Sequence, residues 1–245
     1  NNEILYELIS AAAWSDSRID LDAFLASYSK ARYGAADPAF TTFWNELRQS
    51  VYDNFTNNAR FIWQQRPAYH RGETMNINEH YFNGIEAFLS VAETYRNNEL
   101  YVADAVQYAA LYLAAKADYA LKAANWAVVA DYSDKARELK EQLKEILLDM
   151  DRLLESHPIL RIQRWFDMAD AVSTNEKEAA DFKKEIKRLV STWSGPSLKD
   201  YSARVWSGLV RDYYVPRLDY YFEKAIAGEL ADMVSSDNTF HYGTG

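Results

Sequence analysis

The chain has 245 residues, 49% of them hydrophobic, which is enough to bury a large core in one domain or in two closely packed ones. Its formal net charge is −9 with no basic patch to offset it. This excludes nucleic acid as the main partner, because phosphate binding needs a basic surface. Cysteine is absent, which excludes disulfides, a thiol nucleophile and sulfur-ligated metals.

The composition is typical of an all-helical protein. Glycine and proline are few, and Ala, Leu, Glu and Lys dominate. We therefore predict an all-α fold, a multi-helix bundle of mostly antiparallel neighbouring helices without significant sheet. No apolar run approaches the roughly 20 residues that a bilayer-spanning helix needs, so we predict no membrane span. The first residues follow a helical pattern and do not have the pattern of a signal sequence.

Residues 1–55 are predicted to form three helices. Asp20 and Asp37 each precede a helical pattern and suit the N-cap, where a side-chain oxygen accepts backbone N–H groups. Gly34 suits the left-handed position that follows a helix, and Pro38 suits a first turn. The three predicted helices cover 1–14, 21–33 and 39–52.

A stretch without helical periodicity runs from Asp53 to Arg71 and is crowded with Asn, Arg and aromatic residues. We predict an irregular connector over 56–77. A connector of about 20 residues in a compact domain is more often functional than idle, or it lies against another domain. We expect it to contribute, with the loop around Trp193, to an exposed apolar face that another domain covers.

The main helical bundle is predicted over 78–234, where apolar residues keep helical spacing. A long Ala-rich segment should form a central helix, because small residues let neighbouring helices approach closely. The helix after Ser133 has fewer than three heptads, which favours packing within the bundle over a free coiled coil. Pro216 should kink or break the last helical stretch. The predicted helices cover 78–96, 99–130, 133–154, 159–172, 174–193, 198–214 and 215–234, followed by a polar tail over 235–245.

Several classes of chemistry lack their starting residues. There is no Gly-rich phosphate loop and no Gly-x-Ser-x-Gly motif, so nucleotide hydrolysis and esterase chemistry have no basis. The histidines do not show the spacing of metal ligands, and we predict no metal and no cofactor. These histidines are His70, His80, His157 and His241.

The stretch from Ser191 to Lys224 has the features of a binding site. One helical pattern ends at Trp193, Gly195-Pro196 breaks the chain, and a helix is predicted to restart near Ser197. Trp193 and Tyr201 offer flat amphipathic faces of the kind that stack on sugar rings. The alternative interpretation is an inter-helix loop whose aromatic side chain fills the core, because aromatic residues at helical spacing are usually core residues.

This stretch resembles the C-terminal helical region of the α-N-acetylglucosaminidases, glycoside hydrolase family 89. The resemblance extends from Asn1 to about Glu223, although its middle rests on helical pattern more than on identities. In the C-terminal part it is carried by Thr192-Trp193, Gly195-Pro196, Leu198, Asp200-Tyr201, Trp206-Ser207-Gly208-Leu209 and Tyr213-Tyr214-Val215-Pro216-Arg217. In the N-terminal part it is carried by Asn2-Glu3, Tyr6, Leu8, Ala31-Arg32-Tyr33-Gly34, Ser50-Val51-Tyr52 and Arg66-Pro67.

The resemblance implies that this chain is the C-terminal portion of a longer enzyme and caps a catalytic barrel. The partners it implies are the barrel domain of the same polypeptide and a glycan ending in α-linked N-acetylglucosamine. Residues 1–55 would continue from the barrel. Trp193 would stack on or wall the sugar, Leu198 would give an apolar contact, and Tyr201 would contact the sugar by its ring or hydroxyl. A secreted, periplasmic or lysosomal location fits such an enzyme.

No catalytic residue is predicted within this chain. Glycoside hydrolysis with retention needs two carboxyl groups about 5 to 5.5 Å apart, and in the family both catalytic glutamates belong to the barrel. The acids here, such as Glu138, Glu141 and Glu145, follow the spacing of a solvated helix face. The chain alone should be inactive. The alternative function is a non-catalytic helical module that binds a protein or a glycan independently of any hydrolase.

Overall fold

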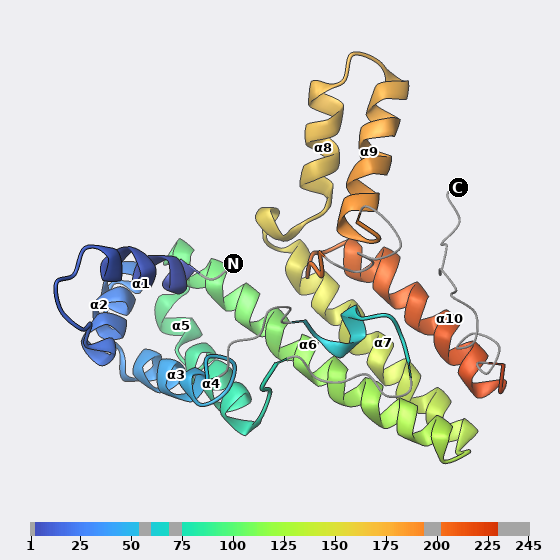
Figure 1. Ribbon diagram of the computed structural model, residues 1–245, viewed down its shortest axis with the longest axis horizontal. Helices are drawn as coiled ribbons and strands as arrows, with labels where there is room; N and C mark the ends of the chain where they lie inside the picture. Colours follow the sequence, from blue (N-terminus) through green and yellow to red (C-terminus); the bar gives the residue numbers. More distant parts are fainter. Residues whose placement is uncertain (1–2, 54–59, 69–74, 194–201, 230–245) are drawn as a thin grey trace. The chain divides into compact units, whose positions relative to one another are not determined.

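The computed structural model describes residues 3–53, 60–68, 75–193 and 202–229 (Figure 1). These residues form helices and no β-strand, so the predicted all-α class is confirmed. None of the described helices combines the length and the apolar composition that a bilayer span requires. The α-helices are α1 (Glu3–Ala13), α2 (Leu21–Tyr33), α3 (Pro38–Arg48), α4 (Glu79–Leu89), α5 (Ala92–Tyr95), α6 (Glu99–Val129), α7 (Ser133–Glu155), α8 (Gln163–Val172), α9 (Glu176–Val190) and α10 (Val215–Ile226). Short 3-10 helices cover Ile62–Gln64 and Pro158–Leu160, and a π-helical turn covers Val210–Tyr214.

The caps predicted from the sequence set the bounds of α2 and α3. The Asp20 carboxylate accepts two backbone N–H groups in the first turn of α2. Gly34 ends that helix in the left-handed region at φ 89°, and its N–H donates to the Lys30 carbonyl at 3.0 Å. Asp37 caps α3 by accepting the Ala39 N–H at 2.9 Å.

The chain divides into two compact units, and α6 contributes to both. The N-terminal unit comprises Asn1–Phe55 and Asn76–Ala109. The C-terminal unit comprises Thr56–Met75 and Ala110–Gly245. The division predicted from the sequence, into 1–55, 56–77, 78–234 and 235–245, remains a prediction.

The core of the N-terminal unit is a cluster of aromatic side chains around Phe88 of α4. Such pairs stabilise a core beyond the area they bury, because ring edges and faces carry opposite partial charges. Gly84 lets α4 lie against α3, since a Cβ there would stand 3.2 Å from the Phe43 carbonyl oxygen. The ring centroids around Phe88 are those of Tyr101 at 4.8 Å, Phe43 at 4.9 Å, Tyr108 at 5.0 Å, Tyr33 at 5.4 Å and Phe40 at 5.5 Å.

A buried carboxylate, Asp104 of α6, fastens α2 in the N-terminal unit. It accepts hydrogen bonds from Nε and Nη2 of Arg32 at 2.5 and 2.8 Å and from the Tyr33 hydroxyl at 2.8 Å. Burial, with the nearby Asp104 carboxylate, raises the pKa of the Tyr33 hydroxyl above its ordinary range. The guanidinium and the hydroxyl together satisfy a charge that would otherwise be costly to bury.

The C-terminal unit is built on α6, α7 and α10. Both Lys140 and Lys144 of α7 form ion pairs with Asp219 of α10, at 3.1 and 2.9 Å. The alanines predicted to allow close helix approach are fully buried in α6, and large apolar side chains fill α7 and α10. This buried set is Ala114, Ala117, Ala124, Ala127, Leu143, Leu147, Met150, Leu154, Leu218 and Phe222.

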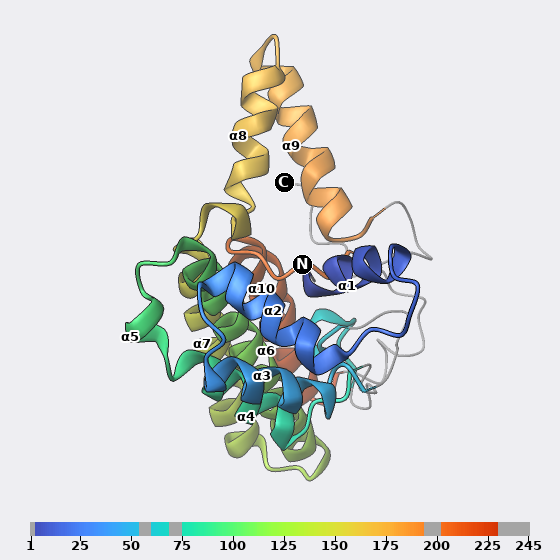
Figure 2. The same cartoon turned by 90° about the vertical axis from the view of Figure 1, so that its left-hand side faces the viewer.

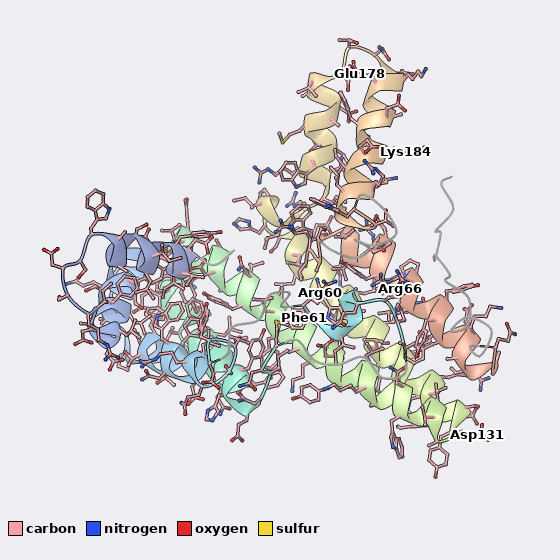
Figure 3. All side chains as sticks on the ribbon, in the orientation of Figure 1. Arg60, Phe61, Arg66, Asp131, Glu178 and Lys184 are labelled. Atoms are coloured by element: carbon pink, nitrogen blue, oxygen red, sulfur yellow. The ribbon has the colours of Figure 1, made fainter. Side chains whose placement is uncertain are left out.

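The helices α8 and α9 form an antiparallel hairpin that projects beyond α7 and α10 in both views (Figures 1 and 2). Ala169 is the one fully buried residue of α8, and α9 has none. Glu178 and Lys184 mark the far end and the middle of the hairpin in Figure 3. The hairpin is held to the unit by its base, where α9 ends just before Trp193.

We predict that Asp104→Ala destabilises the N-terminal unit by about 3 kcal/mol, because it leaves the half-buried Arg32 charge and the buried Tyr33 hydroxyl without their acceptor. The matched control is Asp22→Ala, which breaks the exposed ion pair between Asp22 and Arg48. That change should cost less than about 1 kcal/mol. Urea denaturation of both variants measures the difference, and equal costs would contradict the role assigned to Asp104.

Candidate functional site

Trp193 lies at the turn that follows α9 and has a left-handed backbone with φ 59°. Its N–H donates to the Arg188 carbonyl at 2.7 Å, and its own carbonyl accepts from Arg188 Nη1 at 3.4 Å. Such a conformation costs a non-glycine residue roughly 1 kcal/mol, so the surroundings must hold it. The ring is half-buried, so one part of it stays accessible. The sequence-predicted end of this helix at an aromatic turn is therefore observed.

The other two predicted sugar-contacting residues, Leu198 and Tyr201, lie outside the described residues. The structure describes instead the two ends of the segment that contains them. Ser202 resumes the described chain, and its hydroxyl donates to the Val190 carbonyl at 3.1 Å. The last turn of α9 and the residue after Tyr201 are thus joined.

The predicted helix over 198–214 is wrong over residues 202–208, while residues 198–201 lie outside the described residues. Residues 203–206 have no helical structure, and helical backbone begins at Leu209. Ser207 instead pairs with the chain before α8: its N–H donates to the Leu160 carbonyl at 2.8 Å, and its carbonyl accepts the Ile162 N–H at 3.0 Å. The change from π-helical to α-helical bonding then falls just before Pro216, the residue that cannot donate a backbone hydrogen bond.

Asp151 of α7 determines where this last helical stretch begins. Its Oδ1 accepts the Gly208 N–H at 2.8 Å and the Arg211 N–H at 3.1 Å, while Oδ2 accepts the Ser207 hydroxyl at 3.2 Å. The carboxylate thus caps a helix to which it does not belong. Burial raises the pKa of Asp151, and the hydrogen bonds from Arg211 and Gly208 oppose that shift. Gly208 meets this geometry at φ 83°.

Within the described part of the connector, residues 60–68, the four residues from Phe61 to Gln64 are buried and the flanking ones are partly exposed. The expectation of an exposed aromatic face is therefore wrong for Phe61 and Trp63, and the other aromatic residues of the connector lie outside the described residues. Phe61 and Ile62 are each 4% exposed, Trp63 is 0% exposed and Gln64 is 1% exposed. The described aromatic residues of the connector, Phe61 and Trp63, belong to the core of the C-terminal unit, and Figure 3 labels Phe61 next to Arg60.

Two groups of α6 hold the connector at Trp63. The Trp63 indole N–H donates to the Ala114 carbonyl at 3.1 Å, and its backbone N–H donates to Asp118 Oδ1 at 3.1 Å. Burial raises the pKa of Asp118 to about 7, although hydrogen bonds from the N–H groups of Ile62 and Trp63 lower it. Asp118 therefore exchanges its proton near neutral pH.

Arg217 of α10 holds the same segment from the other side. Its Nη2 lies 3.0 Å from the carbonyl oxygens of both Gln64 and Gln65, and its guanidinium lies over the Tyr213 and Tyr214 rings. Gln64 in turn donates from Nε2 to the Ala203 carbonyl at 2.8 Å. The connector and the segment after Tyr201, which the sequence predicted separately, are therefore joined.

These groups can position a binding loop, but they do not form a reaction centre. Within the described residues, no group of three or more His, Asp and Glu side chains is arranged to hold a metal ion. Asp118, Asp151 and Arg217 were not predicted as positioning residues. The sequence pattern that could have identified Asp118 and Asp151 is an acidic residue among apolar residues on the buried side of a helix. A buried acidic side chain requires a hydrogen-bonding partner.

The fold, together with the groups that hold the chain on both sides of the Trp193 loop, defines an all-helical domain. This domain carries an aromatic residue at a fixed turn. The chain matches the family described as the α-N-acetylglucosaminidase (NAGLU) C-terminal domain over residues 24–241. It belongs to that family. The resemblance stated from the sequence, to the C-terminal region of glycoside hydrolase family 89, is thereby confirmed.

Similar proteins are considerably longer than this chain. It is 27% identical to human α-N-acetylglucosaminidase, with 92% of this chain and 31% of the human protein covered. It shares its fold, with a TM-score of 0.85 and 22% identity, with CpGH89 from Clostridium perfringens in complex with its substrate GlcNAc-α-1,4-galactose, covering 98% of this chain and 29% of that one. A family 89 glycoside hydrolase from the same organism, in complex with PUGNAc, gives a TM-score of 0.80 and 23% identity over 94% of this chain and 28% of that one. This chain therefore spans less than a third of the length of these relatives.

We predict that Gly208→Ala destabilises the C-terminal unit by about 3 kcal/mol or more. The left-handed backbone alone costs alanine about 1 kcal/mol, and the new Cβ would stand 2.6 Å from Ile162 Cγ2. Gly228→Ala is the matched control, because Gly228 has φ 73° and nothing within 4 Å of the added Cβ. Chemical denaturation compares the two variants. Equal losses would mean that the contact with Ile162 does not constrain the start of the last helix.

We predict that Asp118 makes the folded state less stable as the pH rises from about 4 to about 7. Its ordinary pKa of 3.8 is raised to about 7, so the folded protein retains a proton over that range that the unfolded chain has lost. The loss of unfolding free energy caused by Asp118 is roughly 4 kcal/mol at most, and it is complete above pH 7. Asp118→Asn keeps the acceptor oxygen without the charge and should flatten this part of the profile. Urea denaturation at pH 5 and pH 8 tests this, and an unchanged profile in the variant would contradict it.

Proposed function

We propose that this chain is the C-terminal part of an α-N-acetylglucosaminidase, in which it caps the catalytic barrel and completes the pocket for a terminal α-linked N-acetylglucosamine. The observation that carries the proposal is the family match over 24–241 together with the fixed turn at Trp193. In this proposal residues 1–55 continue from the barrel. The bundle predicted over 78–234 presents the loop that closes the pocket.

The described geometry suits Trp193 to a sugar pocket. Its backbone is held by Arg188, so less backbone entropy is lost when a ligand binds. An indole face stacks on the apolar C–H face of a sugar ring. Leu198 and Tyr201 are assigned to the same pocket by their match to the family motif. They would add an apolar contact and an aromatic or hydroxyl contact.

The chemical step belongs to the remainder of the enzyme in this proposal. Hydrolysis of an α-glycosidic bond with retention requires a nucleophilic carboxylate and a second carboxyl group that donates and then accepts a proton. The catalytic barrel would supply both. This chain would bind and orient the sugar and exclude water from one side of it, which contributes to catalysis through positioning.

The alternative is an independent module that binds a protein or a glycan. The two proposals differ in what the reading frame should encode before this region. The enzyme proposal requires that the reading frame encode a βα-repeat barrel with two suitable glutamates before this region. A reading frame without such a barrel would support the alternative.

We predict that Trp193→Ala in the complete enzyme lowers kcat/KM by roughly two- to tenfold or more, mainly through a higher KM. The loss of about 0.5 to 1.5 kcal/mol of stacking free energy between the indole and the sugar gives this change. Trp126→Ala is the matched control, because Trp126 is an exposed indole on α6. Steady-state kinetics on an aryl α-N-acetylglucosaminide and thermal denaturation are measured on the same preparations.

The competing role of Trp193 as core filler gives a different result. Its removal would then cost roughly 3 to 5 kcal/mol of stability, and the folded enzyme would keep its kinetic constants. An unchanged kcat/KM in a folded Trp193→Ala variant would remove Trp193 from the proposed pocket.

We also predict that the 245-residue chain alone is folded and mostly helical but hydrolyses no aryl α-N-acetylglucosaminide. The physical reason is that it would lack the carboxylate pair. Circular dichroism and a chromogenic assay check both parts. Reproducible turnover above a buffer blank would show that this chain holds a catalytic centre of its own.

A further inference from the structure

Two tryptophans and two arginines form a surface cluster at the base of the α8–α9 hairpin. The Trp165 and Trp206 rings stack with centroids 5.9 Å apart and an interplanar angle of 23°. The Arg164 guanidinium carbon lies 5.3 Å from the Trp165 ring centre, and that of Arg204 lies 5.7 Å from the Trp206 ring centre. We call these four residues the Trp–Arg patch.

The arginines of the patch have no acidic partner in the described part of the chain. No hydrogen bond or ion pair joins Arg164 or Arg204 to a described carboxylate, although the chain carries 36 acidic residues against 27 basic ones. Asp167, one helical turn after Arg164, accepts instead from Gln163 at 2.8 Å. Both guanidinium groups are exposed, so their donors are available to a partner.

The patch adjoins the base of the loop that carries Trp193. Trp206 follows Ser202, whose hydroxyl is bonded to Val190 at the end of α9. The backbone pairing of Ile162 with Ser207 fixes the start of α8 against the same segment. The patch and the end of α9 are therefore connected within the C-terminal unit through the Ser202–Val190 hydrogen bond.

The composition of the patch is that of an interface centre. Trp and Arg are the residues most enriched where truncation weakens protein–protein binding most. A guanidinium held over an indole is ordered in advance, so less side-chain entropy is lost when a carboxylate binds to it.

We propose that the Trp–Arg patch binds a carboxylate-bearing surface of the part of the longer polypeptide that lies outside this chain. The inference rests on the proposed function. Two observations select this occupant: the unpaired positive charge of the patch, and relatives of which this chain covers only 29 to 31%. A second copy of this chain is disfavoured, because it would bring another net charge of −9 to the contact.

The first test is arginine footprinting of the complete enzyme with phenylglyoxal and mass spectrometry. Arg164 and Arg204 should react about tenfold more slowly in the complete enzyme than in the 245-residue chain, because an ion pair covers them. Arg18 is the internal control, being exposed and without a described partner. It should react at similar rates in both proteins.

The second test reverses the charges. The complete enzyme with Arg164→Glu and Arg204→Glu should lose activity on heating about tenfold faster than one with Arg18→Glu and Lys184→Glu, which changes the net charge equally. Equal rates of inactivation, or equal reactivity of all three arginines, would overturn the inference. Protection that grows with protein concentration and a doubled mass would overturn it in favour of a second copy. Protection that appears only with an added anionic polysaccharide would overturn it in favour of a glycan.

These outcomes are separate from the test of the proposed function. If the kinetic effect of Trp193→Ala is observed and Arg164 and Arg204 react freely, the proposed sugar pocket is supported and the proposed docking surface is overturned. If Trp193→Ala has no kinetic effect while the arginines are protected, the chain docks on the longer polypeptide without completing its sugar pocket.

Discussion

The arrangement of the candidate site depends on one buried carboxylate, Asp151. It accepts two backbone N–H groups and a hydroxyl from the segment that begins the last helical stretch. Without these bonds the N–H groups at that helix start would be buried and unsatisfied, which costs roughly 1 to 3 kcal/mol each. The bonds fix Gly208 and keep residues 203–206 out of the helix. The chain can therefore return from the Trp193 loop to pair with the start of α8.

Asp118 and Arg217 form hydrogen bonds with backbone groups of the connector, as Asp151 does with backbone groups at the start of the last helical stretch. Each is buried, and each satisfies backbone groups of a segment in which the short 3-10 helix Ile62–Gln64 is the one regular element among the described residues. Gln64 then links that segment to Ala203. The C-terminal unit thus uses charged side chains on regular helices to position irregular chain, which provides a rigid base for loops that bind ligands.

The sequence predicted those parts of the fold that local rules determine. Asp20, Gly34 and Asp37 were correct because a cap lies within a few residues of the helix end it satisfies. The predicted continuation of a helix through residues 202–208 was wrong because the acceptor near the observed helix start lies 57 residues away, on α7. The burial of Trp63 could not be predicted either, since its partners Ala114 and Asp118 are more than 50 residues distant. At the site, the sequence predicted the turn at Trp193 but not the groups that hold the loop ends.

The proposed role of Trp193 in a sugar-binding pocket can be examined in a crystal structure of the complete enzyme with N-acetylglucosamine bound. If the proposal is correct, the Trp193 ring lies within about 4.5 Å of the sugar carbons, and the hydrogen bonds to the Arg188 carbonyl and to the Asp151 carboxylate are unchanged. A bound sugar with the Trp193 ring outside van der Waals contact, packed into the helical core, would contradict it.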